Sequence, residues 1–148
     1  MSRRKFAAIA CAAALAGTVA LAAFAAGPAA AQTNSAGLAG TWRGSYTCAQ
    51  GLTALTLVIT GAGENLAARF EFSAHPSNPG VPSGSFTLAG RFEAKTGEIT
   101  LTPVSWIDRP PDYQMVPLSG RVSDGGRAIA GRVLTEGCSS FSVERAAK

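Results

Sequence analysis

The segment from Gly40 to Cys48 constrains the fold more than any other stretch, because its side chains alternate strictly between two sets. Alternation with a period of two is typical of a β-strand that has one buried face and one wet face. A tryptophan this early, with glycines beside it, indicates the floor of a small β-barrel. One face carries Trp42, Gly44, Tyr46 and Cys48, and the other carries Thr41, Arg43, Ser45 and Thr47.

The rest of the chain repeats this design as short alternating segments, each followed by a turn that contains Gly or Pro. We find no convincing helical period after residue 40. Eight short strands are the number at which an antiparallel up-and-down barrel closes and removes its exposed edges. We therefore predict an all-β, eight-stranded antiparallel barrel. Its expected strands are residues 40–48, 52–60, 66–74, 83–92, 98–106, 113–122, 128–135 and 140–145.

Residues 1–31 have the parts of a signal peptide: a basic start, an Ala-rich apolar run, and small residues at 29–31. We expect cleavage before Gln32. Because the apolar run is mostly alanine and is interrupted by Gly17 and Thr18, we expect no stable membrane anchor. Residues 32–39 are small and polar and predict a flexible N-terminal arm. Residues 40–148 then form a single β-barrel domain.

The first residues also indicate the export route. Ser2-Arg3-Arg4-Lys5-Phe6 resembles the twin-arginine signal, whose core is Ser-Arg-Arg-x-Phe. An ordinary Sec signal with a basic start is the alternative. Both routes imply a bacterial protein that is periplasmic or secreted.

The net charge of +4 belongs mostly to this leader, which holds three of the 13 basic residues. The remaining chain has 10 basic residues against 9 acidic ones. Its few charges are scattered singly, so we expect no nucleic-acid partner. We expect a monomer.

Cys48 and Cys138 are the only cysteines outside the leader. In an eight-stranded meander the end of the first strand lies beside the start of the last, which brings these two positions together. In an exported protein, two such cysteines predict a disulfide; the alternative is a pair of free thiols.

Pairing through Cys48 and Cys138 sets the register of the first and last strands, and Trp42 then faces about residue 144, beside Arg145. A cation over the indole would form a cation–π lid at the floor. Gly40-x-Trp42 with Arg145 resembles the closure of lipocalin- and avidin-type barrels, which implies a calycin-like fold. The odd-numbered residues Phe141, Val143 and Arg145 are expected to point inward, whereas Cys138 has an even number and would point outward on the same strand. Either a bulge separates them or Cys138 belongs to the turn.

A broader set of residues resembles an uncharacterised secreted bacterial domain that also occurs with caspase-like peptidases. The resemblance spans about residues 40–145 and implies no ligand or catalytic residue; the peptidase part is absent. Small periplasmic inhibitors of lysozyme or of metalloproteases are similar in format only. The matching segments are 42–51 through Leu57, 78–84, 106–107, 137–138 and Phe141.

The connections between the expected strands fall into two classes, and the classes alternate. The second, fourth and sixth are tight turns rich in Gly and Asp or Asn, which supply the positive φ that hairpins need. The third and fifth are longer and contain several prolines, and all odd-numbered connections share one end of a meander. We therefore expect a binding rim at that end. The candidate binding residues are His75, Asn78, Trp106, Asp108, Arg109 and Tyr113.

We expect no catalytic activity, cofactor or metal. His75 is the only histidine, and a triad with Asp108 or Asp112 and with Ser83 or Ser139 is the sharpest enzymatic alternative. The chain has no nucleophile-elbow motif, and a single histidine does not build the usual zinc sites.

Two function classes follow. The first is an exported, non-catalytic binding module that engages a protein or a cell-envelope polymer through its rim; a periplasmic inhibitor of a lysozyme or protease would be such a module. The second is a carrier that holds a small ligand in the barrel interior, which needs a cavity of several hundred Å³. Bulky inward rings favour the first class. They are Trp42, Tyr46, Phe70, Phe72, Phe86 and Phe92.

Overall fold

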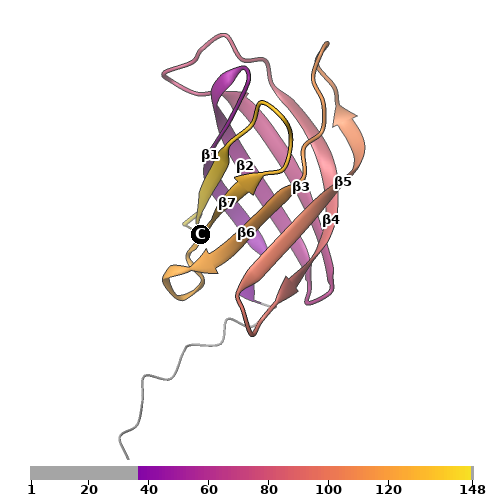
Figure 1. The fold of residues 1–148 in the computed structure, drawn as a ribbon, viewed down its shortest axis with the longest axis vertical. Coiled ribbons are helices and arrows are strands. Elements are labelled where there is room, and N and C mark those ends of the chain that lie inside the picture. Colours follow the sequence, from indigo (N-terminus) through magenta and orange to yellow (C-terminus); the bar gives the residue numbers. More distant parts are fainter. Residues whose placement is uncertain (1–36, 148) are drawn as a thin grey trace, which may run out of the picture.

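The chain forms a closed antiparallel barrel in which each strand pairs with its neighbours in sequence and the last strand pairs with the first (Figure 1). The computed structural model describes residues 37–147. The predicted all-β, eight-stranded up-and-down barrel is confirmed. Its strands are β1 Gly40–Cys48, β2 Gly51–Ala62, β3 Asn65–Ala74, β4 Gly84–Glu93, β5 Glu98–Asp108, β6 Leu118–Ser123, β7 Ala128–Val133 and β8 Ser140–Arg145.

The barrel closes between β1 and β8, where Trp42 lies directly opposite Arg145. The register predicted from the sequence placed Trp42 opposite residue 144, one residue away from Arg145, because that register was counted from the disulfide. Cys138 lies in the turn before β8, so the second of the two explanations for its parity is correct. At Gly44 a Cβ atom would collide with the backbone of Ser142, so only glycine lets β1 and β8 approach this closely.

The eight strands define two ends of the barrel. The rim is the end with connections 49–50, 75–83, 109–117 and 134–139; the floor is the end with connections 63–64, 94–97 and 124–127. All four rim connections lie at the top of Figure 1. The tight turns at the floor use positive φ at Gly63, Gly97 and Gly125, as their sequences predict.

Strand β6 begins at Leu118, five residues later than predicted. Pairing between β5 and β6 covers only residues 98–101 of β5, and residues 102–108 pair with β4 alone. Two β-bulges interrupt the β4–β5 ladder and add Val104 and Ile107 as extra residues. Bulges bend and twist a strand, which turns this half of β5 away from β6. Val104 and Ile107 are consequently 60% and 57% exposed.

The interior is packed with the predicted inward aromatic side chains. Phe70 stacks on Phe86 with ring centroids 4.5 Å apart, and Tyr46 meets Phe70 edge-on at 5.2 Å. All six rings of the predicted inward set are buried. These rings fill the middle of the barrel and lie beneath the connections of the rim.

The floor is sealed by Trp42 and Arg145. The Trp42 side chain is fully buried, and the Arg145 guanidinium carbon lies 4.2 Å from its ring centroid, as expected for a cation–π contact. Arg145 also donates hydrogen bonds to the backbone oxygens of Gly37, Ala39 and Gly126.

The last residues of the expected flexible arm pack against this floor. Leu38 is fully buried, and its carbonyl accepts a 2.9 Å hydrogen bond from the Trp42 indole. Leu38 therefore belongs to the hydrophobic core, and its carbonyl supplies the partner that a buried indole N–H needs. The expected signal peptide and residues 32–36 lie outside the described residues. Within residues 37–147, no helix has the length and apolar character to cross a membrane.

Candidate functional site

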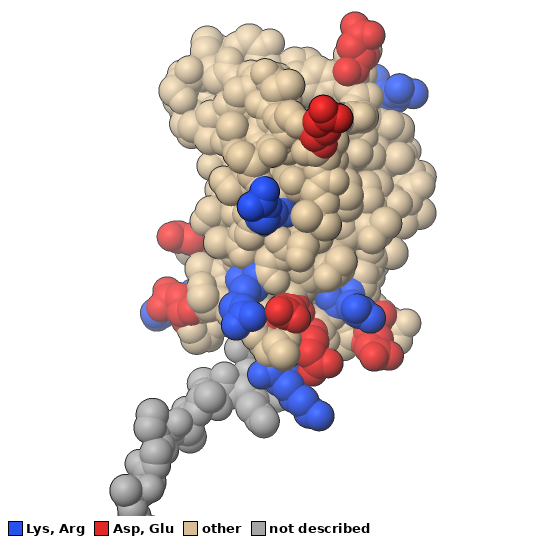
Figure 2. All heavy atoms as spheres, viewed as in Figure 1, with Lys and Arg blue, Asp and Glu red and all other residues tan. Residues whose placement is uncertain are grey.

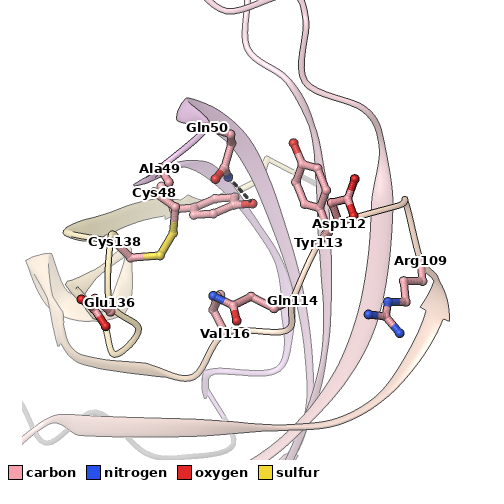
Figure 3. A pocket seen from close by; sticks show the side chains of 11 residues that line it. Cys48, Ala49, Gln50, Arg109, Asp112, Tyr113, Gln114, Val116, Glu136 and Cys138 are labelled. Atoms are coloured by element: carbon pink, nitrogen blue, oxygen red, sulfur yellow. Dashed lines mark hydrogen bonds between the residues drawn. A yellow bond between two sulfur atoms is a disulfide. The ribbon is translucent and has the colours of Figure 1, made fainter.

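A cavity of about 590 Å³ opens at the rim, and we call it the rim cup (Figure 3). It is formed by the end of β1 with the 49–50 turn, by the 109–117 connection, and by the 134–139 connection. Its volume falls within the range of small-molecule sites. The lining residues are Tyr46, Cys48, Ala49, Gln50, Arg109, Asp112, Tyr113, Gln114, Val116, Glu136 and Cys138.

The confirmed Cys48–Cys138 disulfide forms one wall of the cup. It ties the end of β1 to the turn before β8. The backbone N–H of Ser139 donates to the Thr47 carbonyl at 2.9 Å, which extends the contact between the two strands beyond β8 itself. The cup therefore has one covalently fixed side.

Tyr46 forms the base of the cup and is only 4% exposed. Its hydroxyl oxygen accepts a 3.1 Å hydrogen bond from the Gln50 side-chain amide. Burial raises the pKa of Tyr46, and the nearby Tyr113 raises it further. Tyr46 therefore remains a neutral phenol in the folded protein.

Gln50 is held in place from two directions. Its amide nitrogen also donates to the Thr53 hydroxyl at 3.2 Å, and its backbone carbonyl accepts a 2.8 Å bond from the Asn78 amide. Asn78 donates in addition to the Leu52 carbonyl at 3.1 Å. The amide of Asn78 thus fastens the 75–83 connection to the 49–50 turn.

The opposite wall comes from the 109–117 connection. The Tyr113 ring stacks on Phe72 with centroids 5.2 Å apart and an interplanar angle of 10°. Val116 is buried beneath this wall and belongs to the core. These contacts fix the part of the connection that is not in a strand.

The charged side chains of the cup occupy its edge. Arg109, Asp112 and Glu136 are all exposed, whereas Tyr46, Gln50 and Tyr113 are buried or half-buried. Figure 3 shows Arg109 and Glu136 on opposite sides of the opening, with the Tyr113 and Gln114 side chains between them. The centre of the cup is therefore polar but uncharged.

Two of the predicted binding residues, Arg109 and Tyr113, line the cup. Trp106 lies beside it, half-buried, with its ring edge-on to Phe86 at 5.3 Å and the Arg109 guanidinium 5.8 Å from its centroid. Trp106 is packed against the core, and the Arg109 guanidinium lies over its ring. Asp108 is exposed and lines a separate depression on the outer wall, together with Glu71.

His75 and Asn78 take part in the architecture of their own loop. The His75 Nδ1 atom lies 2.7 Å from the Ser77 hydroxyl and accepts a 3.2 Å bond from the Ser77 backbone N–H. His75 and Asn78 also form an isolated β-bridge. The Asn78 side chain contributes to the cup only through its support of Gln50.

Sequence reasoning missed most of the cup lining. Tyr46 was assigned to the core because its strand position points inward, and its hydroxyl end reaches the cup from there. The lining residues that were not predicted to bind a partner are Tyr46, Ala49, Gln50, Gln114, Val116, Glu136 and Asp112, the last of which was named only for the alternative triad. A Gln in a two-residue turn beside a disulfide was the one available signal.

Comparisons of the chain with protein-family models, with curated proteins and with solved structures each found no match. The closed eight-stranded architecture is compatible with the predicted calycin-like fold. The resemblance to the secreted bacterial domain stays a prediction.

Proposed function

We propose that this protein is an exported, non-catalytic binding module that engages a protein or a cell-envelope polymer through its rim. The observation that carries the proposal is the rim cup, an open cavity with fixed walls at the end where the long connections meet. Long ordered loops on a rigid scaffold are a common location of binding sites. The disulfide is compatible with export by the twin-arginine or the Sec route.

The cup walls are ordered by the protein itself. The disulfide, the Asn78 hydrogen bonds and the stacking of Tyr113 on Phe72 hold three of the rim connections. A site that is ordered before binding loses little conformational entropy when the partner arrives. This favours specific recognition by the rim.

The surroundings of the cup favour a large partner that inserts one group. Val104 and Ile107 are exposed on the free half of β5, next to the half-buried Trp106 and to Arg109. Apolar side chains beside Trp and Arg are typical of interaction surfaces. The aromatic packing below Tyr46 argues against a carrier that encloses its ligand deep in the barrel.

The test is capture of partners from periplasmic extract and envelope fractions by the exported protein. Arg109→Ala and Trp106→Ala should each weaken binding by more than about 1 kcal/mol. Asp124→Ala and Lys95→Ala, at the floor, are the matched controls and should leave binding unchanged. Floor variants that weaken binding more than the rim variants would overturn the proposal.

A further inference from the structure

The rim half of β5 is a strand edge that has a neighbour on one side only. Residues 102–108, which we call the open edge, pair with β4, whereas β6 pairs with residues 98–101 of β5 (Figure 1). Within residues 37–147, no hydrogen bond joins the open edge to any element other than β4. Successive residues of a strand direct their backbone groups alternately to its two sides, so the open edge presents backbone N–H and C=O groups without a partner.

The connection that follows β5 leads away from the open side. Pro110 lies against Gly84 at the start of β4, and Tyr113 stacks on Phe72 of β3. The chain then enters the core at Val116 before β6 begins. The connection therefore crosses the mouth of the barrel and does not continue the sheet beside the open edge.

Exposed apolar side chains surround the gap that this leaves between β5 and β6. Val104 and Ile107 belong to the open edge, and none of its residues is buried. Leu134, which is 52% exposed, follows Val133, and Val133 lies across β6 from Leu101, the last β5 residue that pairs with β6. Three of the four large apolar side chains that are exposed among residues 37–147 are thus found around this gap.

The open edge is complementary to an extended polypeptide. A strand edge presents donors and acceptors in a repeat that a second extended backbone matches, which is how an added strand binds to a sheet. No charged side chain occurs from Thr102 to Ile107, and the charges of Asp108 and Arg109 come at the rim end. The side chains of an added strand should therefore be apolar, with β-branched and aromatic residues preferred.

The open edge is short and irregular, which disfavours pairing with a second copy of the barrel. Its seven residues correspond to one ordinary strand, whereas a stable interface uses roughly 20–30 residues on each side. Pro103 lacks a backbone N–H, and the two β-bulges bend the strand. A short flexible segment can follow this bend, whereas a second rigid barrel cannot.

We propose that the open edge receives an extended segment of a partner protein as an added strand, with apolar side chains on Val104, Ile107 and Leu134. This inference rests on the proposed function, and it selects a protein over an envelope polymer as the partner. Arg109 directly follows the open edge and also lines the rim cup, so a single partner can contact both.

The test starts from a displayed library of linear peptides of about ten residues, selected on the exported protein with its disulfide intact. Each selected peptide is then synthesised in two N-methylated forms, which lack the amide hydrogens of either the odd or the even residues but keep every side chain. An added strand bonds to the edge through one of these two sets. One form should therefore bind at least about ten-fold more weakly, and the other nearly as well as the parent peptide. Hydrogen exchange measured by NMR should show new protection of backbone amides in the open edge.

Substitutions in the protein provide an independent readout. Val104→Lys and Ile107→Lys place a charge on the open edge and should each weaken binding of the selected peptides at least about ten-fold. Leu52→Lys is the matched control, because Leu52 is the fourth exposed apolar side chain and lies on β2, with β3 and β4 between it and β5. It should leave the affinity unchanged.

Three results would overturn the inference: equal binding of both N-methylated forms, equal losses in Leu52→Lys and Ile107→Lys, or a library that yields no peptide whose binding depends on the open edge. Sedimentation that reveals a dimer dissolved by Ile107→Lys would assign the edge to a second copy instead. If capture of a partner depends on Arg109 but not on Val104 or Ile107, or if the captured partner is a polymer, the inference falls and the proposed function stands.

Discussion

Trp42 and Tyr46 lie four residues apart on β1 and both point into the barrel, yet they serve opposite ends of it. The Trp42 indole N–H is bonded to the Leu38 carbonyl, and its ring lies against the Arg145 guanidinium. The Tyr46 hydroxyl faces the rim cup and accepts a hydrogen bond from the Gln50 side-chain amide. The polar atoms at the floor are therefore enclosed by the protein, whereas the Tyr46 hydroxyl borders an open cavity.

The distribution of charged side chains on the surface also differs between the floor and the rim. On the face seen in Figure 2, most charged side chains gather at the lower end, where the floor turns lie in Figure 1. Fewer charges stand near the rim. Exposed charged side chains contribute little to stability. The charges at the floor therefore serve mainly to keep that end solvated, whereas the rim has more uncharged surface that a partner can contact.

Breaking the floor should produce the largest loss of stability. Trp42→Ala removes a fully buried indole and should lower the free energy of unfolding by about 3–5 kcal/mol. Denaturant unfolding measures it. In a Trp106→Phe background the emission of Trp42 should be blue and weakly quenched, because that residue is then the only tryptophan. Red, freely quenched emission would contradict the sealed floor.

Removing the covalent link at the rim should have the next largest effect. Cys48→Ser should reduce the free energy of unfolding by about 2–5 kcal/mol, because the disulfide closes a loop of about 90 residues. Thermal unfolding in the presence and absence of a reductant provides the measurement. If reduction lowers the melting temperature of the wild type but not of Cys48→Ser, the loss belongs to the disulfide; equal shifts in both would contradict this.

The floor cation should contribute less. Arg145→Ala removes the contact with Trp42 and hydrogen bonds to backbone carbonyls, which together predict a loss of about 1–3 kcal/mol. Arg127→Ala is the matched control, because Arg127 pairs only with the exposed Asp124 carboxylate. Urea unfolding of both variants should separate them clearly, and equal losses would show that the lid adds nothing beyond a surface charge.

The features that could be predicted from the sequence depend either on patterns within a few residues or on a choice that has few alternatives. Period-two alternation and glycine turns are read within a few residues, and they located eight strands. The two cysteines after residue 31 allow one pairing, and barrel closure then brings Arg145 to Trp42. These inferences needed only the connectivity of the barrel.

The features that escaped prediction depend on contacts between distant residues. The bulges at Val104 and Ile107 arise from the pairing of β5 with β4, and they delay β6 to Leu118. The burial of Leu38 follows from the hydrogen bond that the Trp42 indole requires. An inward tyrosine has the same sequence pattern whether its hydroxyl is enclosed or open to a cavity, so the role of Tyr46 was hidden.

The smallest effect should come from the Tyr46 hydroxyl, and its pH dependence should appear only at alkaline pH. The pKa of Tyr46 is raised above its ordinary value of 10.0, mainly because burial disfavours the phenolate. Ionisation therefore favours the unfolded chain, and the stability of the wild type should fall as the pH rises above about 10. Tyr46→Phe cannot ionise and should lose less stability over that range. Below pH 9 the two proteins should differ by a constant amount of about 0.5–1.5 kcal/mol, because the ring packing on Phe70 is unchanged and only the hydrogen bond from Gln50 is lost. Parallel pH profiles up to pH 11 would mean that the hydroxyl is freely solvated, which would contradict its burial at the base of the cup.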